Sequence, residues 1–151
     1  MSAKARLAEL GITLPSVATP LAAYVPAVRT GNLVYTSGQL PLEDGTPTHS
    51  GKVGAEVSAE AGRAAARTCA LNGLAAIDAL VGLDSVVRVV KVVGFVASAP
   101  GFTGQPGVVN GASEFLGEVF GAAGAHARSA VGVTSLPLDA PVEVEIIVEV
   151  G

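Results

Sequence analysis

Apolar and polar residues alternate along the end of the chain. In residues 142–150 every even position is apolar, whereas most of the odd positions carry glutamate. A period of two residues is typical of a β-strand that buries one face. The pattern therefore predicts a strand whose even-numbered side chains lie in the core, with Glu143, Glu145 and Glu149 on the opposite face.

Residues 86–96 form a second apolar segment, with valines at both odd and even positions. A strand that is apolar on both faces is usually buried on both faces. The helices of one chain can cover one of these faces, so we expect a partner subunit to cover the other. The segment is too short to span a bilayer, and it also contains Arg88 and Lys91.

Helical spacing of apolar residues follows Ser58, a favourable N-cap, with Glu60 in the first turn, where the helix dipole favours a negative charge. We expect this helix to end at residue 81, before Gly82. Its apolar stripe consists of Ala66, Ala70, Leu74, Ile77 and Val81. The pattern predicts further helices over residues 108–120, after a loop at 101–107, and over residues 2–10.

Residues 25–29 and 33–37 flank a Thr-Gly-Asn turn signal and are expected to form a β-hairpin. Residues 40–54 are expected to be a loop, and residues 128–135 another strand. The elements would follow one another as helix, strand, strand, helix, strand, helix, strand, strand. This order predicts one α+β domain over residues 1–151, with two main helices on one face of a sheet. Residues 1–22 would supply the short helix and an extended approach segment.

The composition narrows the class of protein. The chain has 151 residues, 50% of them hydrophobic and 15% charged, which is typical of a folded domain. Its net charge of −4 disfavours a nucleic-acid-binding surface, which should be basic. The single Cys69 cannot form an internal disulfide and is expected to be a buried apolar residue. Because no secretory signal is visible, we expect a soluble cytoplasmic protein with no membrane partner.

Arg128 and Glu143 are the strongest chemical signal. The histidines, His49 and His126, lack the spacing of metal ligands, and no phosphate-binding loop is present, so neither a metal nor a cofactor is expected. An arginine fork suits a carboxylate ligand, and a nearby glutamate can position or activate water. If the two strands meet, the pair forms a small-acid site. The simpler alternatives are a salt bridge at a strand edge for Arg128 and a solvated carboxylate for Glu143.

Several segments together resemble the RidA (YjgF/YER057c/UK114) family. They are Tyr-Val-Pro-Ala-Val at residues 24–28, Ser-Gly-Gln-Leu-Pro at 37–41, the valine-rich residues 86–96, Asn110, Ala-Arg-Ser at 127–129, Leu-Pro at 136–137 and Glu-Val-Glu at 143–145. The resemblance implies a chorismate-mutase-like fold with a mixed sheet, and a homotrimer that forms a central barrel. It implies that the site lies in a cleft between subunits.

The resemblance also implies a reaction, the hydrolysis of reactive imines and enamines of 2-oxo acids to ammonia and the 2-oxo acid, as with 2-iminobutanoate and 2-iminopropanoate. Arg128 would bind the substrate carboxylate, and Glu143 would orient or activate water. The residues implied to line the pocket are Tyr24, Ser37, Gly38 and Asn110. No cofactor is needed, because an imine carbon is already electrophilic.

Differences from the family pattern leave the natural substrate open and suggest a divergent subgroup. The N-terminal helix is an addition. The position two before Arg128, usually proline, is His126, for which a pocket role and a plain surface role are both open. Two alternatives to the deaminase remain. One is a non-catalytic small-carboxylate-binding or regulatory protein that uses the same cleft. The other, an endoribonuclease, is disfavoured by the acidic charge.

Overall fold

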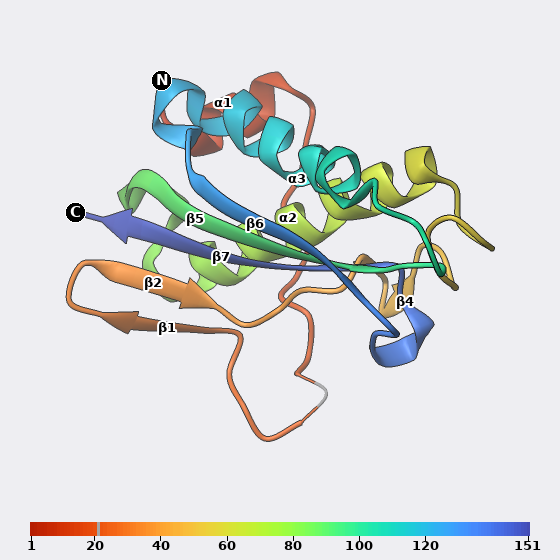
Figure 1. The fold of residues 1–151 in the computed structure, drawn as a ribbon. Helices are drawn as coiled ribbons and strands as arrows, with labels where there is room; N and C mark the ends of the chain where they lie inside the picture. Colours follow the sequence, from red (N-terminus) through yellow and green to blue (C-terminus); the bar gives the residue numbers. More distant parts are fainter. Residues whose placement is uncertain (21) are drawn as a thin grey trace.

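The computed structural model describes residues 1–20 and 22–151 (Figure 1). Its main sheet has the order β1-β2-β7-β5-β6, with bounds β1 Ala27–Thr30, β2 Leu33–Thr36, β7 Val142–Val150, β5 Val86–Ala97 and β6 Ala127–Val133. The helices are α1 Ala3–Glu9, α2 Ala59–Val81 and α3 Gln105–Phe120. All three helices lie on the same side of the sheet in Figure 1. The α+β architecture with a mixed sheet is therefore confirmed.

The central strand β7 has alternating buried and less buried side chains, in agreement with its sequence pattern. Val142, Val144, Ile146, Val148 and Val150 are all buried beneath the helices, as predicted. β7 pairs antiparallel with β2 on one side and with β5 on the other. The predicted stripe of α2 contributes Ala66, Ala70, Leu74 and Ile77 to the same core. By length and composition α2 could also cross a membrane, but much of it is buried against the sheet and α3, as expected of a core helix.

β5 has one covered and one uncovered face. Val89, Val92 and Val96 are fully buried under the helices. β6 joins β5 in parallel after the crossover through α3, as a parallel pair requires. The opposite face of the sheet, which we call the outer face, has no covering element in the part of the chain that the structure describes. It carries exposed apolar side chains on three strands, at Val28, Tyr35 and Val131.

Two local expectations were wrong. The loop expected to reach residue 107 ends earlier, because α3 begins at Gln105 and places Pro106 in its first turn, where proline needs no N–H partner. The loop expected over residues 40–54 contains a short hairpin of β3 Leu42–Glu43 and β4 Thr46–Pro47. Its turn has positive φ at Asp44 and Gly45, a conformation that these residue types tolerate.

The N-terminal helix α1 is anchored to the two main helices. The Ser2 side chain accepts a hydrogen bond from the Ala5 N–H and caps the helix. Leu7 is buried, and Arg6 Nε donates to the Glu118 carbonyl oxygen of α3 at 2.9 Å. These contacts attach the added helix to the domain core. The extended approach segment predicted to follow it includes Leu21, which lies outside the described residues.

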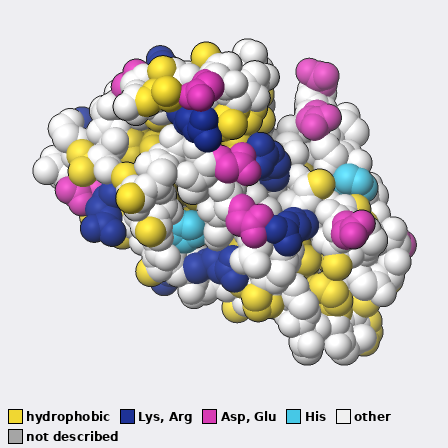
Figure 2. Space-filling model, turned by 90° about the horizontal axis from the view of Figure 1, so that it is seen from above, with side chains coloured by type: hydrophobic (Ala, Val, Ile, Leu, Met, Phe, Trp, Pro, Cys, Tyr) yellow, Lys and Arg dark blue, Asp and Glu magenta, His cyan; other side chains and the backbone are white. Residues whose placement is uncertain are grey.

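The helix-covered side of the molecule carries paired charges. Arg63 forms an ion pair with Glu114, and Arg67 with Glu118, so that α2 and α3 are joined across their exposed faces. The Arg67 guanidinium also lies over the Phe115 ring, 4.6 Å from its centroid. Figure 2 shows basic and acidic side chains next to one another on this side. This side is therefore not a continuous basic surface.

Candidate functional site

Arg128 and Glu143 do not meet within one chain. β5 separates their strands, with Val92 opposite Arg128 on β6 and Phe95 opposite Glu143 on β7. Residues paired across a ladder point to the same face, and successive residues along a strand alternate. Val92 is buried under the helices, so Arg128 faces the helix layer, whereas Glu143 lies on the outer face. The condition stated from the sequence, that these two strands meet, is not fulfilled within one chain, because β6 lies beyond β5 at the edge of the sheet.

Arg128 is held against α3. Its Nη1 donates to Asn110 Oδ1 at 2.7 Å and to Ser113 Oγ at 3.3 Å, and its Nη2 donates to the Pro106 carbonyl oxygen at 3.3 Å. No acidic side chain among the described residues forms an ion pair with it, so the chain does not show the strand-edge salt bridge. A guanidinium has five N–H donors. Within the described chain two remain, as many as a carboxylate accepts in a two-point contact.

The helical spacing explains why these partners converge. Asn110 and Ser113 are three residues apart on α3 and therefore lie on one side of that helix, next to β6. Sequence reasoning identified Asn110 but missed Ser113 and the Pro106 carbonyl group. The i, i+3 spacing of two polar residues within an apolar helix was the available signal for Ser113.

Glu143 packs over Gly38. A Cβ atom added to Gly38 would lie 2.7 Å from Cδ and Oε2 of Glu143, so only glycine fits at this position without moving the carboxylate. Burial, and secondly the neighbouring charge of Glu145, raise the pKa of the half-buried Glu143 carboxyl. Glu143 is therefore not a fully solvated carboxylate, and it holds a proton more readily than an exposed glutamate does.

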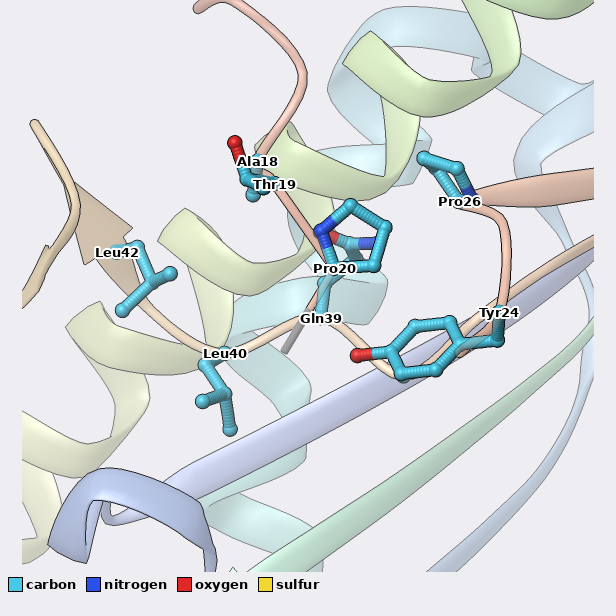
Figure 3. A pocket seen from close by; sticks show the side chains of 9 residues that line it. Ala18, Thr19, Pro20, Tyr24, Pro26, Gln39, Leu40 and Leu42 are labelled. Carbon is cyan, nitrogen blue, oxygen red and sulfur yellow. The ribbon is translucent and has the colours of Figure 1, made fainter. Parts of the chain in front are cut away.

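Tyr24 and Gly38 line a small hollow, and Glu143 packs over the same Gly38. One wall comes from residues 18–20 of the N-terminal segment and the other from residues 38–42 after β2 (Figure 3). The Tyr24 ring points across the hollow toward Leu40 in this view. Ser37 connects the two walls, because its Oγ donates to the carbonyl oxygen of Val25, the residue after Tyr24, at 2.6 Å.

The predicted site residues thus fall into two groups on one chain. Arg128 and Asn110 lie on the helix side of the sheet, and we call them, with Ser113, the arginine half-site. Tyr24, Ser37, Gly38 and Glu143 form the second group, which we call the glutamate half-site. As defined, the arginine half-site contains a cation that can bind an anion, and the glutamate half-site contains a carboxylate, so neither group of described residues contains both charges. Their roles in binding and catalysis stay predictions.

Metal chemistry has no evident location in the described chain. No three His, Cys, Asp or Glu side chains among the described residues lie close enough to bind an ion. Cys69 is fully buried, as expected, and its Sγ donates to the Val142 carbonyl oxygen at 3.6 Å. Burial raises the pKa of this thiol well above its ordinary value. A buried thiol of this kind is a poor nucleophile and serves packing.

Comparison with known proteins gives a consistent assignment. The family model of endoribonuclease L-PSP matches residues 15–150. Protein TCP17 of Trypanosoma cruzi is 47% identical over 149 residues, which cover 97% of this chain and 93% of that protein. A crystal structure of a protein of unknown function from Agrobacterium tumefaciens is 46% identical, with a TM-score of 0.91, over 99% of this chain and 92% of that one.

The YjgF gene product of Escherichia coli has the same fold with a TM-score of 0.66 and 29% identity, over 89% of this chain and 98% of that one. The family model starts after α1, in agreement with an N-terminal helix that is added to a common domain. Since the matched region contains both half-sites and the whole five-stranded sheet, the chain belongs to the endoribonuclease L-PSP family, the group that also carries the names YjgF and RidA.

Proposed function

We propose that the protein is a homotrimer whose active sites lie between subunits, with the arginine half-site of one chain facing the glutamate half-site of the next. The separation of Arg128 and Glu143 on opposite faces of one sheet is the observation that carries this proposal. The uncovered outer face supports it further. An exposed sheet face with apolar residues on several strands is a typical interface between subunits.

The reaction proposed for this site is the hydrolysis of imines of 2-oxo acids. The two remaining donors of Arg128 bind the substrate carboxylate. Water attacks the imine carbon and forms the C–O bond as the C=N π bond opens, while Glu143 takes one proton from the water and passes it to the nitrogen. In the resulting carbinolamine the C–N bond breaks as the C=O bond forms, and Glu143 transfers the hydroxyl proton to the leaving nitrogen. Ammonia leaves, and the 2-oxo acid remains.

The raised pKa of Glu143 suits this proton transfer, because its carboxyl group can accept a proton from water and return it to the leaving nitrogen. General acid–base help of this kind accelerates a step by roughly 10²- to 10⁴-fold. An enamine substrate would first be protonated at carbon to give the imine. The remaining acceleration would come from holding the substrate acid and one water molecule close together and correctly oriented for attack on the imine carbon.

A second candidate is a small-acid-binding protein without turnover. Escherichia coli TdcF, which shares the fold with a TM-score of 0.66 at 24% identity, is described with bound serine. That protein shows that this fold can hold a small amino acid. A binding function in the present chain would use the same arginine half-site.

RNA cleavage, which the family name mentions, has less support in this chain. The net charge is −4, and four of the basic side chains form ion pairs with carboxylates. They are Lys4, Arg6, Arg63 and Arg67. A surface that binds RNA needs basic groups available for phosphates. We therefore do not assign this activity.

A turnover assay separates the two leading candidates. Freshly generated 2-iminobutanoate is mixed with the protein, and the release of ammonia and 2-oxobutanoate is followed above the spontaneous rate. The deaminase proposal predicts an acceleration that disappears in Arg128→Ala. Tight binding of 2-oxobutanoate with no acceleration would instead establish the binding protein.

A further inference from the structure

His126 is connected to the Arg128 guanidinium through Ser113. The His126 Nε2 lies 2.8 Å from Ser113 Oγ, and its Nδ1 lies 2.6 Å from the Gly124 carbonyl oxygen. The same Ser113 oxygen accepts a hydrogen bond from Arg128 Nη1. The imidazole is half-buried between the end of α3 and the start of β6. It is therefore part of the support of the arginine half-site rather than a free surface group.

The hydrogen bonds assign the proton of the neutral ring. The Gly124 carbonyl oxygen can only accept, so Nδ1 carries the proton and donates to it. Nε2 is then an acceptor, and the Ser113 hydroxyl group donates its hydrogen bond to it. With its proton turned toward His126, the Ser113 oxygen presents its lone pairs to Arg128. The histidine thereby sets the direction of the hydroxyl group that holds the guanidinium.

We propose that His126 and Ser113 are positioning residues that fix the plane of the Arg128 guanidinium for two-point recognition of a carboxylate. The proposal rests on the proposed function, in which Arg128 binds the substrate acid. An arginine side chain has many rotamers. Without Ser113 the guanidinium would keep a short bond to Asn110 at 2.7 Å and a longer one to the Pro106 carbonyl oxygen at 3.3 Å. The bond from Nη1 to Ser113, directed by His126, adds a third contact that limits the remaining rotation of the plane.

Position 126 is where this chain differs from the family pattern. The proline expected there has neither a side-chain donor nor an acceptor, so it could not direct Ser113. The histidine adds a directed hydrogen bond behind the guanidinium. Its effect should appear as a preference for a carboxylate over an amide, because a carboxylate has two oxygens that accept from two donors of a fixed fork at once, whereas an amide has one.

The test compares the affinity of the full-length protein for 2-oxobutanoate with its affinity for the uncharged 2-oxobutanamide, by titration calorimetry. His126→Leu and Ser113→Ala should each reduce the preference for the carboxylate by about 3- to 10-fold, the effect of losing one hydrogen bond. The double variant should be no weaker than either single variant, because both act through one link. His126→Gln should largely restore the preference, since its Oε1 can accept from Ser113.

Glu114→Gln is the matched control, because Glu114 is next to Ser113 on α3 but forms its ion pair with Arg63. Its carboxylate preference should equal that of the wild type. Melting temperatures establish that the variants are folded, and Ser113→Ala keeps the test decisive if His126→Leu unfolds.

An unchanged carboxylate preference in both single variants would overturn the proposal, and so would a His126→Gln variant as weak as His126→Leu. If Arg128→Ala abolishes that preference while the two positioning variants keep it, the proposed function stands and the positioning role fails. If the wild type binds neither probe, both fail.

Discussion

Arg128 and Glu143 are charged side chains whose surroundings suit different tasks. Arg128 is fixed by three hydrogen bonds to uncharged oxygens, so its charge is oriented without being neutralised by an ion pair. Glu143 is packed over Gly38, and burial raises the pKa of its carboxyl. An oriented cation suits recognition of an acid, and a carboxyl with a raised pKa suits proton transfer.

Arg128→Ala should abolish acid binding and turnover while the fold persists, because the side chain is only half-buried. Loss of a charged contact to a ligand costs about 2–5 kcal/mol, or about 30- to several-thousand-fold in kcat/KM. Arg128→Lys should recover little, because an ammonium group cannot make the two-point contact. Steady-state kinetics on 2-iminobutanoate test this, with Arg63→Ala, on the exposed face of α2, as a control. Wild-type activity in Arg128→Ala would place the site elsewhere.

Glu143→Gln should lower turnover while the binding of 2-oxobutanoate survives. Glu145→Gln and Glu149→Gln, on the same face of β7, should have little effect on either quantity. Initial rates and calorimetry on the three variants provide the comparison. Equal, small effects at all three positions would show that Glu143 is not the base.

The raised pKa of Glu143 leads to a prediction about how the stability of the protein depends on pH. A carboxyl whose pKa is higher in the folded state binds more protons there than in the unfolded chain. The free energy of unfolding therefore falls as the pH rises from the unfolded pKa through the raised folded pKa. Glu143→Gln removes this penalty and should be at least as stable as the wild type at pH 7. A lower melting temperature at pH 7 but not at pH 4 would contradict this.

Gly38→Ala should act as an indirect Glu143 variant. The added Cβ would lie 2.7 Å from the Glu143 carboxyl group, and the flexible end of that side chain can move away while the backbone stays in place. We expect a folded protein whose turnover falls toward that of Glu143→Gln. Kinetics and a melting curve measure both effects, and full activity in Gly38→Ala would mean that the position of the carboxylate is not critical.

At the scale of elements, α2 and α3 approach closely through glycine. A Cβ at Gly111 of α3 would lie 2.0 Å from the Arg63 carbonyl oxygen of α2, and neither backbone can yield locally. Gly111→Ala should therefore destabilise the protein by about 1–3 kcal/mol or more. Gly117→Ala on the same helix meets nothing within 4 Å and should be neutral or stabilise by up to about 1 kcal/mol. Denaturant unfolding of the two variants measures the change in the free energy of unfolding from the wild type. These changes should have opposite signs or clearly different sizes.

The elements were largely predictable, because each has a local signal. Alternation predicted β7 residue by residue, and Ser58 and Gly82 marked the limits of α2. The start of α3 was placed too late because its first turn contains glycine and proline, which have low helix propensity but cost little at a helix start. The relation of Arg128 to Glu143 could not be read from spacing, since strand order depends on tertiary packing. Ser113 had a local signal in its i, i+3 spacing to Asn110, but that spacing does not show which strand this side of α3 faces.

At the scale of the whole molecule, one chain contains two incomplete half-sites and an uncovered sheet face. Val28, Tyr35 and Val131 remain exposed on that face, and a symmetric assembly would bury it while bringing unlike half-sites together. The proposed homotrimer predicts a single trimeric species by sedimentation at micromolar concentration. A stable monomer would remove the shared site.

Mixed assemblies of inactive variants test the central claim most directly. Arg128→Ala retains a glutamate half-site, and Glu143→Gln retains an arginine half-site. If each active site joins two chains, co-expression in equal amounts should restore about one quarter of the wild-type sites, because random assembly places the two intact half-sites together with that frequency. Each variant alone should stay inactive. No recovery in mixed assemblies of verified composition would contradict a site that is shared between subunits.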